Sequence, residues 1–359
     1  MPYCRNCGAK LEDNARFCRV CGTPVVPESA QQTKLITSVY RQQPAPKTGV
    51  PFWAIMFIIA AALVLVAVVI VFLPIEQVDF DQSNQVTAAN LDTFELNLEA
   101  EIANVNLFLR DLPGNQTAVL NVSATGWRGI FGSNTPVALH FDEDRSDGAL
   151  IWTAKVLRSG NWPIYNRLDI NCNVYVDPEA DLEISIVTET GSVAFNGNSE
   201  SNFQNLKLQA TTGSITASLN ENVIISGAFQ LETTTGRVQL NWNNAGASGT
   251  IPIGVKTTTG SIELNVTQTR QLTGNVTLDA EATTGGLTMT LDLQNDVGAR
   301  IAASTVMGGI NVEQQGFSGN SVPLQSDNYP SRNNFGITLR TTLGGVDIDA
   351  SYDLAGIRS

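Results

Sequence analysis

Three segments of one pattern decide the fold: Leu206-Lys-Leu-Gln-Ala-Thr-Thr-Gly-Ser-Ile-Thr-Ala217, Phe229-Gln-Leu-Glu-Thr-Thr-Thr-Gly-Arg-Val-Gln-Leu240 and Ile253-Gly-Val-Lys-Thr-Thr-Thr-Gly-Ser-Ile-Glu-Leu264. Counted from the glycine, apolar residues stand at −7, −5, +2 and +4, with a small residue or threonine at −3. Strict alternation is typical of half-buried strands. Each copy therefore predicts two strands joined by a bend at the glycine.

The pattern repeats along the C-terminal part of the chain. A further Thr-Thr-Gly copy ends at Gly285, and degenerate copies centre on Gly191, Gly308 and Gly344. Successive glycines lie 22 to 25 residues apart, except for a gap of 36 before the last one. Such a period marks solenoids, in which stacked copies bury an apolar column that no copy could bury alone. We predict a mainly β fold, with a parallel β-solenoid (β-helix) over residues 174–359 and hydrogen-bonded ladders of threonine hydroxyls.

The alternative is an antiparallel sandwich in which each Thr-Thr-Gly is a hairpin turn. Hairpins favour Asn-Gly or Asp-Gly, and sandwiches do not keep one register at a fixed spacing. The insertion at 314–334 carries the contact-prone Phe317 and Tyr329, so we expect a partner site there. A mobile spacer or a C-terminal cap element is the competing interpretation.

Residues 74–173 fit the repeat less well, and we interpret them as an N-terminal β cap or irregular first coils. Val137, Leu139 and Phe141 are expected to face Leu150, Trp152 and Ala154 across a hairpin. Trp127, Trp152 and Trp162 are interpreted as packing residues of this cap rather than as a platform for stacking sugars.

A family resemblance covers about residues 170–350. It rests on Val174-Tyr-Val-Asp-Pro178, on Leu182-Glu-Ile-Ser-Ile186 and on the repeated Thr-Thr-Gly-Ser-Ile. These segments resemble the DUF4097-like adhesin domains, which form β-solenoids on prokaryotic envelopes. The resemblance implies a surface-exposed binding or structural domain with no established chemistry, and it assigns no functional residues.

The first 26 residues carry two C-x2-C pairs, each followed by glycine (Gly8 and Gly22). Two residues between paired thiolates let one tight turn present both sulfurs to one ion. Four thiolates complete a tetrahedral site with no open position, so the pattern predicts one structural Zn²⁺ rather than a catalytic metal. Two disulfides are the less favoured alternative. The predicted metal ligands are Cys4, Cys7, Cys18 and Cys21.

Residues 3–23 resemble the short zinc-ribbon domain found at the N-termini of many prokaryotic membrane proteins. That resemblance implies a small module for protein interaction or tethering. Basic residues such as Arg5 and Arg16 give the ribbon some basic surface, but Glu12 and Asp13 dilute it, so nucleic-acid binding is disfavoured.

A tether and a membrane span follow the ribbon. Residues 27–51 are rich in Pro, Gln, Ser and Thr, which predicts a disordered linker. The 22 residues of 52–73 are all apolar and would span about 33 Å as a helix, enough to cross a bilayer. A cleaved signal peptide is disfavoured because the run is long and lacks a small-residue cleavage site. Lys34, Arg41 and Lys47 precede the span, whereas no Lys or Arg lies between Leu73 and Arg110, so the N-terminus is expected in the cytoplasm.

Charge and composition limit the chemistry. The first 51 residues carry net charge +4 and the residues from Pro74 onward −17, which disfavours nucleic acid as a partner of the large region. A single histidine, His140, makes histidine-based catalysis improbable. The run from Asp142 to Gly148 departs from a Ca²⁺ loop at two positions and is interpreted as a hairpin turn. Cys172 is expected to be a buried small hydrophobe.

Four Asn-x-Ser/Thr motifs are compatible with glycosylation of an exposed outer domain, although such motifs also arise by chance. They begin at Asn115, Asn121, Asn265 and Asn275.

These observations predict a non-enzymatic, single-pass envelope protein. An extracytoplasmic β-solenoid would serve adhesion, surface structure or binding of a protein or glycan, and a cytoplasmic zinc ribbon would bind a protein partner. The alternatives are a transmembrane regulator or sensor with the ribbon as its output, and a polysaccharide-active β-helix enzyme, for which no cluster of Asp, Lys and Arg recurs on one face of the repeats.

Overall fold

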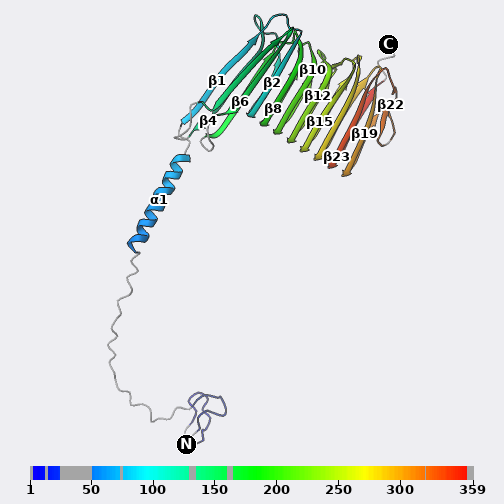
Figure 1. The fold of residues 1–359 in the computed structure, drawn as a ribbon. Coiled ribbons are helices and arrows are strands. Elements are labelled where there is room, and N and C mark those ends of the chain that lie inside the picture. The colour runs from blue at the N-terminus through cyan, green and yellow to red at the C-terminus, as the bar shows by residue number, and fades with distance from the viewer. Residues whose placement is uncertain are drawn as a thin grey trace. The chain divides into compact units, whose positions relative to one another are not determined.

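The computed structural model describes residues 3–12, 15–24, 51–72, 76–128, 135–159, 165–319 and 321–353. Its parts are a small cysteine-rich head, a helix and a β domain, and each is described by itself (Figure 1). Most of the predicted linker lies outside the described residues.

The helix α1 runs from Phe52 to Phe72 and contains no charged residue. Its 21 residues span about 32 Å at ~1.5 Å per residue, so it is long and apolar enough to cross a membrane. The predicted last residue, Leu73, lies outside the described part of the chain.

The β domain contains a thirteen-stranded sheet, here sheet 1, and an eleven-stranded sheet, here sheet 2. Sheet 1 consists of β2 (Thr93–Ile102), β5 (Val137–Ser146), β6 (Ala149–Arg158), β8 (Asp181–Thr190), β10 (Ser201–Thr212), β12 (Val223–Thr235), β14 (Gly246–Ala247), β15 (Thr250–Thr259), β17 (Asn275–Thr284), β19 (Val297–Met307), β21 (Phe317–Ser318), β22 (Leu324–Ser326) and β23 (Asn333–Leu343). Sheet 2 consists of β1 (Glu76–Thr87), β3 (Asn104–Leu109), β4 (Gln116–Arg128), β7 (Tyr165–Val176), β9 (Val193–Gly197), β11 (Ile215–Leu219), β13 (Val238–Asn243), β16 (Ile262–Gln268), β18 (Leu287–Gln294), β20 (Ile310–Gln315) and β24 (Val346–Asp353).

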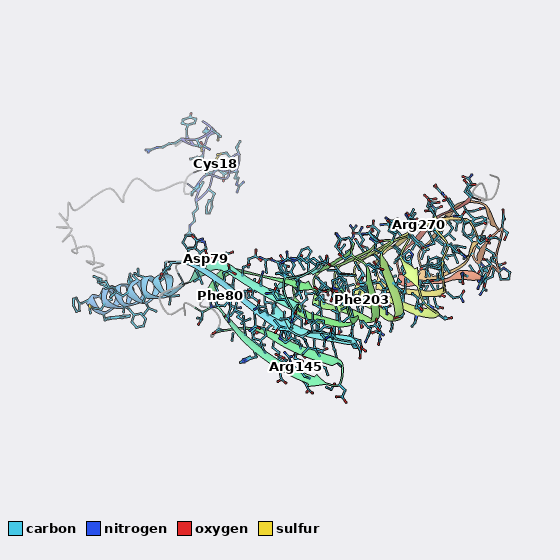
Figure 2. The ribbon with its side chains drawn as sticks, turned by 90° about the horizontal axis from the view of Figure 1, so that it is seen from above. Cys18, Asp79, Phe80, Arg145, Phe203 and Arg270 are labelled. Carbon is cyan, nitrogen blue, oxygen red and sulfur yellow. The ribbon has the colours of Figure 1, made fainter. Side chains whose placement is uncertain are left out.

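Each repeat contributes one strand to each sheet, and equivalent strands of successive repeats pair in parallel. The register is the one that the sequence predicts: Leu206 lies opposite Phe229, and Phe229 lies opposite Ile253. These inward residues are buried in one continuous core between the sheets. In Figure 2, Phe203 lies within the domain while Arg145 and Arg270 lie at its periphery. The predicted parallel β-solenoid is confirmed.

The bend glycines form a column of close backbone contacts. Gly260 has φ +149°, and a Cβ built on it would lie 1.8 Å from the carbonyl oxygen of Gly236 in the preceding coil. The predicted threonine ladders take a different form here. The buried hydroxyl at −3 donates to the glycine carbonyl of the neighbouring coil, at 3.2 Å from Thr257 to Gly236 and 3.0 Å from Thr233 to Gly213. The exposed threonines that precede Gly236 and Gly260 contribute through their backbone, because the Thr259 carbonyl accepts the Gly236 amide at 2.9 Å.

The first coil in sequence is not the first in space. Strands β2 and β3 form a regular coil that lies between the coil of β6 and β7 and the coil of β8 and β9. Strands β1, β4 and β5 add to this end in antiparallel fashion. The predicted hairpin is present, but its register differs: Phe141 lies opposite Ala154, whereas Leu139 lies opposite Val156 and Val137 opposite Arg158. Trp152 is buried, as cap packing requires, but Trp127 is 45% exposed, so that interpretation does not hold for Trp127; Trp162 lies outside the described residues.

The last coil in sequence is also placed inside the stack. Strands β23 and β24 lie between β17 and β18 on one side and β19 and β20 on the other (Figure 1). The coil around Gly308 is therefore the terminal one in space. The insertion before β23 forms the antiparallel pair β21 and β22, and β22 pairs with Arg300 and Ile301 of β19. Phe317 and Leu324 of this segment are buried, so it packs on the end of sheet 1 as the cap interpretation expects, and the partner site at 314–334 stays a prediction.

Candidate functional site

Two turns of matching geometry hold the four cysteines of the head. The amide of Gly8 donates to the Cys4 carbonyl at 2.9 Å, and the amide of Gly22 donates to the Cys18 carbonyl at 2.7 Å. Both glycines have φ near +70°, a conformation that L residues rarely adopt. The sequence pattern C-x2-C-G therefore builds the same knuckle twice.

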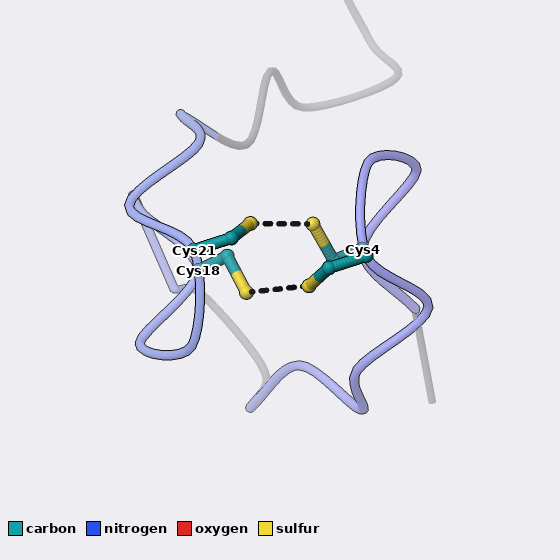
Figure 3. Close-up of side chains that lie close together, drawn as sticks. Cys4, Cys18 and Cys21 are labelled. Carbon is teal, nitrogen blue, oxygen red and sulfur yellow. Dashed lines mark hydrogen bonds between the residues drawn. The ribbon is translucent and has the colours of Figure 1, made fainter.

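The four sulfur atoms face one another and fit one metal ion (Figure 3). The Cys4 and Cys21 sulfurs lie 3.6 Å apart, as do those of Cys7 and Cys18, and all four lie within 4.8 Å of one another. A tetrahedron with Zn–S bonds of about 2.3 Å has S···S edges of about 3.8 Å. Disulfide bonds would need about 2.05 Å. The centre is compatible with one structural Zn²⁺, and its cysteines are free.

Neighbouring donors favour the thiolate form at two of these positions. The Thr23 hydroxyl lies 3.1 Å from the Cys21 sulfur and lowers the pKa of that thiol, to about 6. The backbone amides of Cys21 and Val20 lower the pKa of Cys18. At Cys7 the backbone amide of Ala9 acts in the same direction, but the Cys21 sulfur and burial outweigh it and raise the pKa of that thiol to about 12. Metal binding requires deprotonated sulfur, so a cation at this centre would displace the Cys7 proton.

The outer face of sheet 1 carries paired charges. Lys155 lies 2.6 Å from Glu99, and Arg340 lies 3.2 Å from Asp279. Exposed ion pairs of this kind contribute little to stability, but they make this face ionic in character.

The outer face of sheet 2 is different over β3, β4 and β7, where side chains are amides, hydroxyls and aromatic rings. We call this surface the amide face, and Asp169 carries the one carboxylate among its members. It consists of Asn104, Asn106 and Phe108 on β3, Val119, Asn121, Ser123, Thr125 and Trp127 on β4, and Asp169, Asn171, Asn173 and Tyr175 on β7.

Asparagine side chains pair across the strands of the amide face. Asn106 donates to Asn173 at 3.0 Å, and Asn104 donates to Asn171 and to Asp169, each at 3.4 Å. A primary amide offers two donors and an oxygen with two lone pairs. The single bond between Asn106 and Asn173 therefore leaves hydrogen-bonding capacity on both side chains.

An aromatic pair closes one end of the amide face. Phe108 and Tyr175 stack with ring centroids 5.3 Å apart, and the Arg110 guanidinium lies 3.8 Å from the Tyr175 centroid. These contacts hold the rings in place while leaving Phe108 38% exposed. Trp127 is the other exposed aromatic residue of the face.

A polar cleft of about 310 Å³ begins beside this pair. Its lining includes Asp111, one residue after Arg110, and Asp177, two residues after Tyr175. Asp177 accepts hydrogen bonds from the amides of Leu112 at 2.9 Å and Glu179 at 3.2 Å, which fixes one wall. Neither the cleft nor the amide face was predicted from the sequence.

Other residues singled out in the sequence have structural positions. The run from Asp142 to Gly148 ends β5 and makes the hairpin turn to β6, with Gly148 at φ +75°. Cys172 is buried in the core, and burial raises the pKa of its thiol to about 12. Among the Asn-x-Ser/Thr motifs, Asn115 is exposed, whereas Asn265 donates to Asn241 at 3.0 Å.

Comparisons with known proteins agree with the parts described above. A zinc-ribbon domain family matches residues 3–25. No curated protein matches the sequence.

Solved structures similar to this chain bear adhesin names. A "putative cell adhesion protein" from Clostridium sporogenes is 15% identical, with a TM-score of 0.37 over 76% of this chain and 99% of its own. A "putative adhesin" from Bacteroides fragilis is 8% identical, with a TM-score of 0.27 over 77% of this chain and 98% of its own. These low scores leave the ligand of the β domain to be inferred from its own residues.

Proposed function

We propose that this chain is a non-enzymatic, single-pass envelope protein whose β-solenoid is displayed outside the membrane for adhesion, surface structure or partner binding, with the zinc ribbon in the cytoplasm. The observation that carries the proposal is the asymmetry of basic residues about α1. Lys34, Arg41 and Lys47 precede the helix, and no Lys or Arg occurs from its end to Arg110. Retention of basic flanks on the cytoplasmic side would leave the β domain outside.

The cysteine chemistry supports the same orientation. A centre of four thiolates persists in a reducing compartment. The β domain contains one cysteine, the buried Cys172, so it has no pair to oxidise. Both parts of the chain therefore suit the compartments that the basic residues assign to them.

The ribbon itself presents apolar side chains that suit a protein partner. Tyr3, Phe17 and Val20 are exposed on this small domain. The small core of the ribbon consists of Cys4, Leu11 and Cys18, and the three exposed side chains do not belong to it. We expect a protein with Phe17→Ala and Val20→Ala to retain its zinc. In a chemical crosslinking experiment, it should lose the crosslinks that the wild-type ribbon forms with a cytoplasmic protein.

Labelling of single engineered cysteines tests the orientation. Asn198, in the exposed connection between β9 and β10, is suitable as an outer site. In intact cells, a maleimide that cannot cross membranes should label Asn198→Cys and leave Ser38→Cys unlabelled.

Permeabilised cells supply the control, because both variants should then react. The wild-type chain should give little signal in intact cells, since Cys172 is buried and the other cysteines are in the ribbon. Labelling of Ser38→Cys but not of Asn198→Cys in intact cells would reverse the orientation and overturn the proposal.

A further inference from the structure

The ligand class of the β domain can be inferred from the amide face. We propose that this face, with the polar cleft beside it, binds a neutral polysaccharide chain that lies along strands β4, β7 and β3. The proposal names the ligand class of the displayed domain and so rests on the proposed function. Its support comes from the arrangement of aromatic rings, amides and charge.

The first step is the spacing of the exposed rings. Trp127 and Val119 lie on the same side of β4, eight residues apart, and Val119 lies opposite Tyr175. At ~3.3 Å per strand residue, Trp127 is about 26 Å along the strand from the pair of Phe108 and Tyr175. Pyranose rings present apolar C–H faces that pack against aromatic rings, and two platforms at this spacing suit an oligosaccharide of several units rather than a single sugar.

The second step is the chemistry between the platforms. Two rows of neutral polar side chains cross the strands there, one through Asn121, Asn173 and Asn106 and the other through Ser123, Asn171 and Asn104. Amides both donate and accept, which matches hydroxyl groups that do the same. Their mutual hydrogen bonds hold the rows in place, which reduces the entropy lost when a ligand binds.

The amide face differs in charge from the rest of the protein. The protein has a formal net charge of −13, and the outer face of sheet 1 carries ionic pairs. Asp169 is the one carboxylate among the members of the amide face, and the exposed Asp79 and Asp81 of β1 lie at its edge, opposite Thr125 and Ser123. The outward side chains of β9 and β11 continue this neutral surface; they are Ala194, Asn196, Thr216 and Ser218. A neutral ligand meets no repulsion here, whereas an anionic polysaccharide would face an acidic protein.

The fourth step is the cleft at the end of the face. Its volume of about 310 Å³ lies at the lower end of the range for small-ligand sites. Asp111 and Glu179 line it and can accept hydrogen bonds from sugar hydroxyls. The terminal unit of a chain that passes over Phe108 would reach this cleft.

Binding is tested with the full-length protein in nanodiscs. The probes are hexasaccharides of glucose, mannose, xylose and N-acetylglucosamine, with hexagalacturonate as the anionic comparison. We expect at least one neutral hexasaccharide to bind, with hexagalacturonate weaker. Trp127→Ala and Phe108→Ala should each weaken that binding by about tenfold or more, which corresponds to about 1.4 kcal/mol.

The matched control is Leu157→Ala, because Leu157 is 37% exposed, close to the 38% of Phe108, and lies on sheet 1. Its binding should equal that of the wild type. Should Phe108→Ala fail to fold, Phe108→Leu retains apolar packing while removing the ring. The disaccharide of the best hexasaccharide should bind more weakly and respond to only one of the two aromatic substitutions, because it cannot span both platforms.

Failure to bind any neutral hexasaccharide would overturn the proposal, as would equal losses in Leu157→Ala and Trp127→Ala. Crosslinking of a photoreactive residue at Thr125 to an envelope protein, with no glycan bound, would also overturn it and assign the face to a protein partner. The binding assay is independent of membrane orientation. Correct cysteine labelling without glycan binding would therefore reject this inference alone, and reversed labelling with glycan binding would reject the display function alone.

Discussion

The column of bend glycines makes the prediction that the structure constrains best. Gly260→Ala would place a Cβ 1.8 Å from the Gly236 carbonyl oxygen, whereas real Cβ contacts stay beyond 3.0 Å. The two coils would have to separate locally by about 1.2 Å. The hydrogen bond from the Gly236 amide to the Thr259 carbonyl, 2.9 Å long, would then exceed bonding distance.

Three contributions set the expected magnitude. A non-glycine residue at φ +149° costs about 1–3 kcal/mol. Loss of the bond at Gly236 and of the neighbouring bond from Val238 to Ser261 costs about 0.5–1.5 kcal/mol each. The lower entropy of the unfolded alanine chain offsets about 0.4–1 kcal/mol. The net destabilisation is about 2–5 kcal/mol.

The measurement is thermal unfolding of the full-length protein in detergent, followed by the circular dichroism of its β-sheet. The melting temperature should fall by at least about 4 °C, at about 2 °C per kcal/mol for a large domain. Gly254→Ala, in strand β15 that leads into this bend, is the control, because its Cβ would meet nothing within 4 Å and its φ is not positive. A melting temperature of Gly260→Ala equal to that of the wild type, or an equal loss in Gly254→Ala, would refute the reasoning.

Four further predictions concern the head, the core and the end of the stack. The full chain should bind one Zn²⁺, and Cys18→Ser should lose it with the fold of the ribbon but leave the melting of the β domain unchanged; unaltered zinc content would contradict the site. Thr257→Val should destabilise the β domain by about 1 kcal/mol, because the Gly236 carbonyl loses its 3.2 Å bond, whereas Thr258→Val, at an exposed position, should not. Deletion of residues 318–331 should lower the melting temperature, since Leu324 and Ser326 are buried against β19; unchanged melting would instead identify a dispensable loop. Burial raises the folded pKa of Cys172 to about 12 from an ordinary 9.0, so the unfolded thiol loses its proton first and the domain loses stability as pH rises above about 9; Cys172→Ala should show a smaller fall in urea midpoint over that range.

Local pattern predicted much of this fold because each inward residue of the repeat has one possible environment. The alternation around Gly213, Gly236 and Gly260 specifies both strands and the bend. The stacking order could not be predicted in the same way. Every coil presents the same kind of apolar column, so the repeat does not encode which coil lies beside which. The coil at Gly344 pairs directly with the coil at Gly285, although another copy lies between them in the sequence.

The metal centre was predictable because a short C-x2-C-G segment fixes its own turn. The amide face was missed because its members come from strands 67 residues apart in sequence. A signal does exist: Asn104-Val-Asn-Leu-Phe108 and Asn171-Cys-Asn-Val-Tyr175 share an outward pattern of asparagine, asparagine and aromatic residue. The buried core residues between them determine the strands, so the outward pattern is visible only once β3 and β7 are known to be neighbours.

Placement of the final coil inside the stack bears on when the domain can be completed. During synthesis, β17 to β20 emerge before residues 333–353, yet β17 and β19 each need β23 as a neighbour. The stack therefore cannot close progressively from one end to the other, and its last segment must enter between coils that already exist. A chain that terminates early would not be a shorter solenoid with an intact end. It would expose two apolar surfaces at once, which makes such a chain prone to aggregation and proteolysis.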